Sequence, residues 1–324
     1  MKDQYLFIEK KEEFYTIVDS IEVWVNSDEL AEIVFSFDGK IPKGVSLREK
    51  AKWLLSFSDC WDYRNKQKVR DKKTGENARW EVNNDGITEK QQQAVKNGIS
   101  TLGLLGVERP QEKEFDYIIA LGGARFSCLY RPQYVNYLIT QAGIKTKEVI
   151  LLSGMREILE SERAATDLYA PQAHTEYDLI NAGAEQVFQL DREYIEERYH
   201  HQNNNLNWAV RNYVVGSEKV PVISLSGPSS EPDKRRANSS DTYKFFIQKK
   251  NVESGTKILL VTSQIYVPYQ QLEAVRTLAE PYGLYIETVG FPPIWSSKLQ
   301  GMMEPANYLQ EIRSTIQAIN RYLF

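Results

Sequence analysis

Small and hydroxyl-bearing residues follow four of the short apolar runs in this sequence, where they could hold a ligand. The four turns are Gly122-Gly123, Ser153-Gly154, Ser226-Gly227 and Thr262-Ser263. Small residues let backbone N–H groups approach a ligand closely, and a helix that begins after such a turn favours an anion. The same residue types also serve turn geometry alone. We therefore expect a small polar, anionic ligand at these turns.

Cationic side chains near these turns could neutralise such a ligand. Arg125 and Arg131 follow the first turn, and a planar guanidinium suits bidentate binding of phosphate or carboxylate. Surface ion pairing is the alternative for each. The basic run 234–236 precedes Asp241 and Thr242, which open a predicted helix. It could hold a phosphate or be a solvated charge run, and Asp241 could instead be the N-cap of that helix.

Proton chemistry has few candidates. His174 and Glu176 lie close together on a predicted helix, where one could move a proton or both could be surface groups. The other two histidines, His200 and His201, lie in a polar segment. Neither Cys60 nor Cys128 has a partner at metal-ligand spacing, so no metal site is expected, and Cys128 is expected to be a buried thiol.

Standard catalytic and cofactor fingerprints are missing from the sequence. The turn at Gly122 does not match G-x-G-x-x-G, and there is no P-loop, H-E-x-x-H or G-x-S-x-G. A dinucleotide-linked dehydrogenase and a serine hydrolase of the common type are therefore disfavoured. The segment 291–295 could supply an aromatic wall to a pocket, with core packing as the equal alternative.

Five continuous apolar runs must position these residues, at 117–121, 148–152, 221–225, 257–261 and 284–289. Such runs are typical of parallel strands covered on both faces, and helical patterns alternate with them. We predict an α/β fold with a doubly wound, mainly parallel, Rossmann-like sheet. The runs ending at Leu121, Leu152 and Val261 should be neighbouring parallel strands. The segment 185–190 could be a further strand.

The first part of the chain has helical signals instead. Ser27 precedes one apolar helix face, and the pairs Ser46/Glu49 and Thr88/Gln91 form capping-box patterns. We predict an N-terminal helical domain over 1–112, with a long polar loop at 62–85 and a linker at 108–112. The second domain, 113–324, should include the last helix and a polar insertion at about 191–219.

Composition narrows the class of protein. The chain has 324 residues and a net charge of −4, with 42% hydrophobic and 26% charged residues, which suits two globular domains. No long basic block suggests a nucleic-acid partner. No leader-like start and no membrane-length apolar stretch is found, so we expect a cytoplasmic protein that has no membrane partner.

The order of these blocks resembles the YdcF/SanA/ElyC-like family of bacterial proteins. The similar blocks are 116–123, Arg131 with 137–138, 149–154, Thr175-Glu176 with 179–184, 239–242 and 260–263. The resemblance implies a Rossmann-like fold with a glutamate, here Glu176, on a helix after the second strand. Some relatives are linked to S-adenosylmethionine, which makes that cofactor an expectation from resemblance alone, and others to the cell envelope.

Some positions depart from the family pattern. Tyr266 and Tyr269 stand where the family has His and Arg, while Asp241 and Phe245 replace two asparagines. The leading interpretation is a protein that binds a nucleotide-like or phosphorylated small molecule, with transfer or hydrolysis as the candidate reactions and Glu176 as the acid or base. A non-enzymatic sensor or partner-binding protein and an S-adenosylmethionine-binding protein stay open. The ligand-binding candidates are Gly122, Gly123, Arg125, Arg131, Ser153, Gly154, Asp241, Thr242, Thr262 and Ser263.

Overall fold

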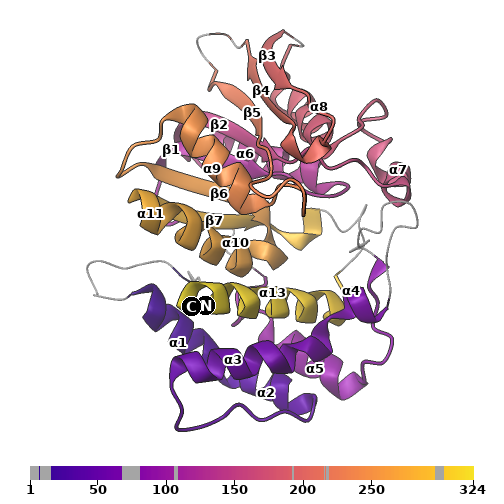
Figure 1. Cartoon of the computed structure of the whole chain (residues 1–324), viewed down its shortest axis with the longest axis vertical. Coiled ribbons are helices and arrows are strands. Elements are labelled where there is room, and N and C mark those ends of the chain that lie inside the picture. Colours follow the sequence, from indigo (N-terminus) through magenta and orange to yellow (C-terminus); the bar gives the residue numbers. More distant parts are fainter. Residues whose placement is uncertain are drawn as a thin grey trace. The chain divides into compact units, whose positions relative to one another are not determined.

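The computed structural model describes residues 7, 16–67, 81–105, 109–191, 193–214, 216, 219–295 and 303–324. The chain forms two compact units (Figure 1). The helical unit comprises Met1–Val107, Gln264–Glu273 and Gly301–Phe324, and the sheet unit comprises Glu108–Ser263 and Ala274–Gln300. The C-terminal segment, which the sequence pattern assigned to the sheet domain, is thus grouped with the N-terminal helices.

The sheet unit contains one seven-stranded sheet. Its strands are β1 (Glu114–Leu121), β2 (Lys145–Ser153), β3 (Tyr194–Tyr199), β4 (Trp208–Tyr213), β5 (Val222–Ser226), β6 (Lys257–Ser263) and β7 (Tyr285–Phe291). Their order is β3-β4-β5-β2-β1-β6-β7, in which β5, β2, β1, β6 and β7 run parallel. The expected adjacency of the runs ending at Leu121, Leu152 and Val261 is confirmed, since β1 lies between β2 and β6.

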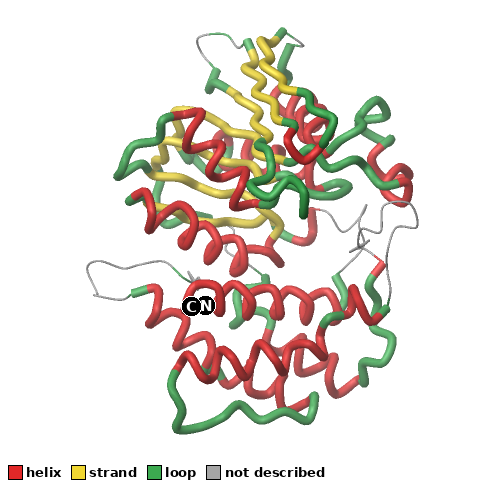
Figure 2. Tube along the Cα trace, viewed as in Figure 1, coloured by secondary structure: helices red, strands yellow, loops and turns green. Residues whose placement is uncertain are grey.

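Helices cover both faces of this sheet (Figure 2). They are α6 (Ser127–Thr140), α7 (Glu160–Thr166), α8 (Glu176–Phe188), α9 (Ser239–Lys250), the π-helix η6 (Val275–Ala279) and α11 (Glu280–Tyr282). Helices α6 and α8 pack on each other and on the strands, and α9 packs with η6. Consecutive residues of β1, such as Ile118, Ile119 and Ala120, are all fully buried. This two-sided burial explains why the strands read as unbroken apolar runs.

Two expectations for the middle of the chain were incomplete. Segment 185–190 is not a strand, because α8 continues to Phe188 and ends at the left-handed Gln189. The helix is held by close packing at Gly183, where an added Cβ would lie 2.3 Å from the Cys128 carbonyl oxygen of α6. The polar insertion forms β3 and β4, which extend the sheet as an antiparallel pair.

The helical unit follows its capping signals. Its elements are α1 (Ile17–Val25), α2 (Asp28–Ser36), α3 (Leu47–Phe57), η2 (Ser58–Trp61), α4 (Tyr63–Lys66), α5 (Glu89–Gly98), η5 (Gln264–Tyr266), α10 (Val267–Ala274) and α13 (Pro305–Leu323). The predicted starts at Ser27, Ser46 and Thr88 are confirmed, the last two with complete capping boxes. Of the predicted loop, 68–80 lies outside the described residues, as does Glu108 of the predicted linker.

Helix α13 owes its place to contacts that are distant in sequence. It packs on α3 and α5, and Asn320 Nδ2 donates a hydrogen bond of 2.9 Å to the carbonyl oxygen of Ala51. Arg321 forms an ion pair with Glu273 of α10. Within the described residues, no helix of either unit has the length and apolar content that crossing a membrane requires.

Candidate functional site

The turn after β1 brings two strand ends unusually close together. The Gly122 N–H donates a 2.7 Å hydrogen bond to the carbonyl oxygen of Leu152 at the end of β2. A Cβ added at Gly122 would lie 2.5 Å from the Ser153 Cβ, so only glycine fits there. An added Cβ at Gly123 would lie 2.9 Å from a guanidinium nitrogen of Arg131. Both glycines of the predicted site therefore let the backbone of the β1 turn lie close to neighbouring side chains, those of Ser153 and Arg131.

Arg131 is buried, with 4% of its surface exposed, and it ties the ends of two strands together. Its Nη1 donates to the carbonyl oxygens of Leu121, at 2.8 Å, and Gly122. Its Nη2 donates to the Ser263 Oγ at 3.3 Å. The arginine of α6 thus fixes the β1 turn against the end of β6. The sequence favoured direct anion binding, whereas the structure places this guanidinium on protein oxygens.

Buried hydroxyls stand at the carboxyl ends of neighbouring parallel strands. Ser153, Ser226 and Thr262 lie at or next to the last positions of β2, β5 and β6, and their exposed fractions are 4%, 0% and 0%. Within the described residues, none of these three hydroxyl oxygens has a hydrogen-bond partner. A buried polar group without a partner costs about 1–3 kcal/mol. This edge of the sheet therefore has polar groups for which the described part of the chain supplies no partner.

A buried ion-pair cluster lies beside the β2 turn. Arg156 contacts Glu162 through two nitrogens, at 2.7 and 3.0 Å, and its Nε donates to Glu176 Oε1 at 2.9 Å. Glu162 is fully buried and also accepts the Leu159 N–H at 2.8 Å. Burial works to lower the pKa of Arg156, but Glu176 and Glu162 together raise it above its ordinary value. The arginine therefore stays protonated between these two side chains.

Sequence reasoning selected Glu176 and missed its two partners. The available signal was an arginine three residues after Ser153, followed by a glutamate in the first turn of α7. Such a signal is weak, because ion pairs of this spacing are common on protein surfaces. Only the burial of Glu162 distinguishes this cluster from a surface pair.

Glu176 lies at the same edge as the glycine turn. The Cys128 Sγ donates to the Gly123 carbonyl oxygen at 3.0 Å and lies 3.8 Å from the Glu176 carbonyl oxygen, so it bridges the two. Glu176 Oε2 would be 3.9 Å from a Cβ on Gly154. Burial raises the pKa of Cys128 to about 12. The thiol is therefore neutral and inert, as expected, while the carboxylate faces the Gly154 turn.

Arg125 has an unusual backbone and links two loops. Its φ is 50°, in the left-handed region that non-glycine residues rarely adopt. Its carbonyl oxygen accepts a 2.7 Å hydrogen bond from the Tyr169 hydroxyl, so the loop after β2 contacts the turn after β1. Burial lowers the pKa of Arg125, and nearby Glu162 works in the opposite direction. The guanidinium lies 5.9 Å from the ring of Phe126.

Asp241 and Thr242 form hydrogen bonds with backbone groups at the start of α9. Asn238, not Asp241, is the N-cap, and Asp241 completes the capping box by accepting the Asn238 N–H at 2.9 Å. Asp241 also forms an ion pair with Arg235, and Thr242 Oγ1 donates to the Ser239 carbonyl oxygen at 3.0 Å. Burial alone would raise the pKa of Asp241, but Arg235 and neighbouring donors lower it below the usual value. Both side chains thus have their partners at or just before the start of α9.

Several other candidates have structural contacts. Phe245 is buried against Gly227 and lies 5.8 Å from the ring of Trp208. Trp295 packs edge-on against Tyr134, at 5.2 Å, which favours packing over a pocket wall for that residue. The three histidines are exposed, and within the described parts of the chain no group of His, Cys, Asp or Glu residues is placed to hold a metal ion. Tyr266 and Tyr269 belong to the helical unit.

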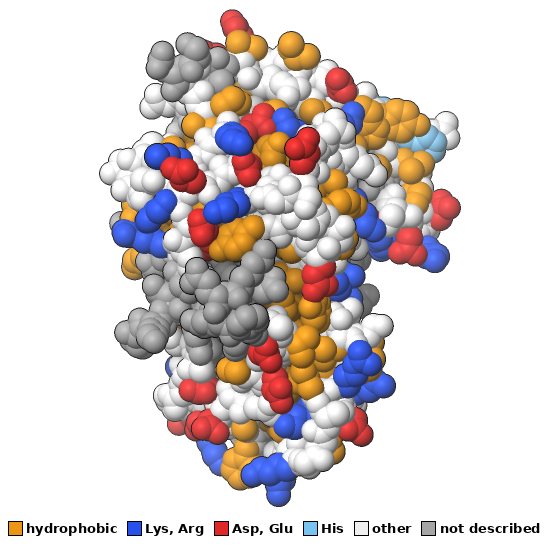
Figure 3. Space-filling view, turned by 90° about the vertical axis from the view of Figure 1, so that its left-hand side faces the viewer, with side chains coloured by type: hydrophobic (Ala, Val, Ile, Leu, Met, Phe, Trp, Pro, Cys, Tyr) orange, Lys and Arg blue, Asp and Glu red, His pale blue; other side chains and the backbone are white. Residues whose placement is uncertain are grey.

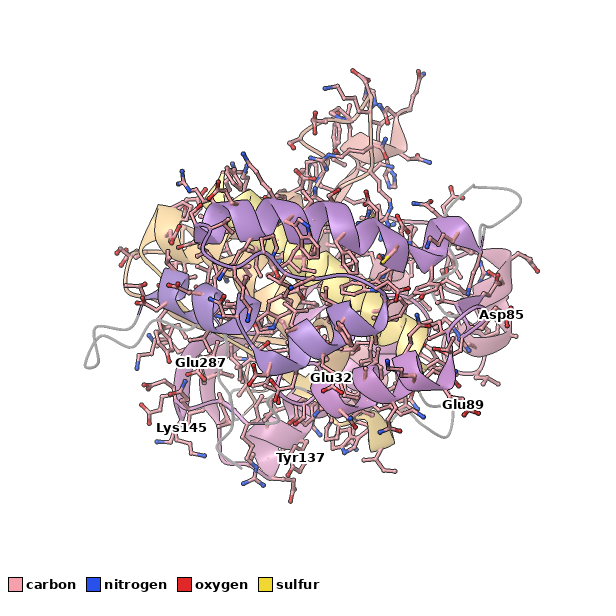
Figure 4. The ribbon with its side chains drawn as sticks, turned by 90° about the horizontal axis from the view of Figure 1, so that it is seen from below. Glu32, Asp85, Glu89, Tyr137, Lys145 and Glu287 are labelled. Atoms are coloured by element: carbon pink, nitrogen blue, oxygen red, sulfur yellow. The ribbon has the colours of Figure 1, made fainter. Side chains whose placement is uncertain are left out.

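A buried acid toward the amino end of β7 was also missed. Glu287 is 1% exposed, and its carboxylate accepts the N–H groups of Gln111 and Glu112 at 2.7 and 3.1 Å. Burial raises its pKa. Glu287 lies on the same side of the molecule as Lys145 (Figure 4). It fixes the segment that leads into β1, at a distance in sequence that no local pattern could reveal.

Acidic and basic side chains are interspersed on the face of the molecule in Figure 3, with apolar groups between them. Neither sign of charge forms a continuous field on that face.

Comparison with known proteins gives one family. Residues 9–103 match the family model described as the Rv3785 N-terminal domain. The chain is 34% identical over 328 residues to uncharacterized protein Rv3785 of Mycobacterium tuberculosis and to uncharacterized protein Mb3814 of Mycobacterium bovis. Each match covers 95% of this chain and 90% of the relative. No solved structure matches the chain.

Proposed function

This chain belongs to the family of the mycobacterial protein Rv3785, and we propose that its sheet unit binds a nucleotide-like or phosphorylated small molecule. The proposed site is the carboxyl edge of the parallel strands. The observation that carries the proposal is the set of buried hydroxyls without partners at three strand ends beside the Gly122 turn. A polar ligand that reaches this edge would supply the missing hydrogen bonds.

The strand order supports a Rossmann-like assignment for the sheet unit. If the parallel strands are numbered as they occur in the chain, β5-β2-β1-β6-β7 reads 3-2-1-4-5. In folds with this order, ligands bind where the order reverses, which here is between β1 and β6. Arg131 joins the ends of these two strands. The YdcF-type resemblance of the sequence blocks agrees with the same arrangement and remains part of the proposal.

The phosphate would lie at the Gly122-Gly123 turn. Helix α6 begins at Ser127, directly after this turn, and its N-terminus favours negative charge. Arg125 adds a partly buried positive charge close by.

The sugar would lie at Glu176. Its Oε1 is held by Arg156, while Oε2 faces the Gly154 turn at the end of β2. A carboxylate near the end of the second strand accepts hydrogen bonds from ribose hydroxyls in dinucleotide-binding folds. We assign Glu176 this role, and the same carboxylate would be the base if transfer or hydrolysis follows. S-adenosylmethionine presents the same ribose hydroxyls and therefore belongs among the ligands to be tested.

A ligand screen with two site variants tests the proposal. ATP, ADP, AMP, S-adenosylmethionine, sugar phosphates and inorganic phosphate would be compared by thermal shift and calorimetry. A ligand at one hundred times its Kd adds about 2.7 kcal/mol to the stability of the native protein. Glu176→Gln and Gly154→Ala should weaken binding about tenfold or more. Lys145→Ala, at the exposed amino edge, is the matched control and should bind normally.

Two outcomes would contradict the proposal. One is a screen in which no compound stabilises the protein. The other is a bound compound whose affinity is the same in both site variants, since it would then bind elsewhere. Product formation from the bound compound, present in the wild type and lost in Glu176→Gln while binding persists, would identify the chain as an enzyme.

A further inference from the structure

Strand β3 is an edge of the seven-stranded sheet (Figure 1), and within the described residues no strand pairs with its outer side. The Val214 N–H donates to the Glu193 carbonyl oxygen at 2.9 Å, which sets the alternation of the β3–β4 ladder. The backbone groups of Tyr194, Glu196 and Arg198 therefore point away from β4. A row of outward N–H and C=O groups is a template for another strand.

Apolar side chains gather on this strand although it lies at the surface. Ile195, Tyr199 and Tyr194 are 70%, 44% and 40% exposed. Exposed apolar side chains that cluster on one strand mark an interaction surface more often than scattered ones do. Glu197 and Tyr199 share a face with Ile195, because alternate residues of a strand point the same way.

Three of the usual protections of an edge strand, namely Lys, Pro and a bulge, are missing from β3. Its six residues contain neither Lys nor Pro, and they pair with β4 in continuous register from Tyr194 to Tyr199 without a bulge. Its charges are neutralised within the chain. Glu196 is bound by Arg211 at 2.9 Å and by Arg198 at 3.1 Å, so it does not repel an approaching strand.

We propose that β3 pairs antiparallel with β3 of a second copy of this chain, with Glu197 on the two-fold axis. In this register Glu196 lies opposite Arg198 of the second copy, and Ile195 lies opposite Tyr199. Pairs of opposite charge and pairs of apolar side chains both stabilise antiparallel strands. The two sheets would then continue across the axis through hydrogen bonds of the outward groups.

A register centred on Glu196 is one alternative that a two-fold axis allows. It would place Ile195 opposite Glu197, so apolar surface would stay unmatched. The chosen register also brings two copies of Glu197 together. Each lies 3.4 Å from Lys249 of its own chain, which offsets their repulsion. The pairing of Glu196 with Arg198 and of Ile195 with Tyr199 therefore favours the first register.

Disulfide cross-linking tests both the partner and the register. In a Cys60→Ser background, Glu197→Cys places two thiols on the axis, where facing Cα atoms lie about 4.5 Å apart, within disulfide reach. Ile195→Cys is the matched control, because its two copies would be about 13 Å apart. Oxidation should convert Glu197→Cys into a covalent dimer and leave Ile195→Cys monomeric on a non-reducing gel. Equal cross-linking of the two variants would overturn the register.

Light scattering after gel filtration tests the dimer itself. The wild type should be a dimer, and Arg198→Pro should raise its dissociation constant about tenfold or more, because it removes an outward N–H and the ion pair with Glu196. The β3–β4 ladder does not use that N–H, so circular dichroism should be unchanged. If this variant misfolds, Arg198→Glu supplies the same test by placing like charges opposite each other. A monomeric wild type, or a dimer that a folded variant leaves intact, overturns the proposal.

Discussion

The ion pair at the amino ends of β1 and β2 lies in water, whereas the ion-pair cluster beside the carboxyl end of β2 is buried. Lys145 and Glu114 form an ion pair whose side chains are 78% and 69% exposed. Arg156 and Glu162 form one whose side chains are 6% and 0% exposed. Exposed pairs add little stability, but a buried charge must keep its partner. The same sheet therefore carries replaceable ions at one end and mutually dependent ions at the other.

Buried charges cost desolvation energy, so the buried ion pairs at the carboxyl edge are weak evidence for stability there. In the sheet unit that edge also has the close glycine turn and the hydroxyls of Ser153 and Thr262 without partners. The exposed ion pair between Lys145 and Glu114 lies at the opposite ends of the strands from these groups.

The largest effect is expected from Arg156→Met. It leaves Glu162 and Glu176 without their shared partner and should lower the free energy of unfolding by about 3–5 kcal/mol. Urea denaturation followed by circular dichroism measures this. A loss as small as that of an exposed pair would remove the contrast between the two ends.

Gly122→Ala should have the next largest effect. The added methyl group would lie 2.5 Å from the Ser153 Cβ, and overpacking of this kind costs about 1–3 kcal/mol. Gly154→Ala is the matched control, since its added methyl group meets nothing closer than 3.9 Å. It should fold normally. Equal melting temperatures for the two variants would show that the β1 turn is not sterically restricted.

Asp241→Asn should lower stability by about 1 kcal/mol, because it weakens the capping box of α9 and removes the ion pair with Arg235. The folded state lowers the pKa of Asp241, so its contribution is present above the unfolded value and is lost as the pH falls through the folded value. The difference between wild type and variant should therefore be full at neutral pH and shrink below about pH 4. A pH-independent difference would contradict this assignment.

Lys145→Ala should have the smallest effect. The lysine is exposed and its ion pair with Glu114 is solvated, so the melting temperature should not change measurably. A clear destabilisation would mean that the amino ends of the strands also carry required ions. Differential scanning calorimetry at low and high salt would detect such a contribution and its screening.

Much of the fold was predictable because its signals are local. The five buried strands appeared as apolar runs, and the capping patterns at Ser46 and Thr88 located two helix starts. The edge strand β3 was missed because three consecutive charged residues, Glu196 to Arg198, interrupt its apolar residues, so the segment resembles a polar loop. Segment 185–190 was ambiguous because a short apolar run fits a helix or a strand equally well.

The sequence by itself determined the carboxyl edge as the place of the candidate site, since strand ends with Gly, Ser and Thr can be read directly. Tertiary structure decided what each side chain does there. Arg131 binds strand carbonyls, Arg156 joins Glu162 to Glu176, and α13 packs with the N-terminal helices. The physical reason is the distance along the chain over which each kind of signal acts. Periodicity and caps depend on neighbours within a turn of the chain, whereas the partner of a buried charge is set by which distant segments pack around it.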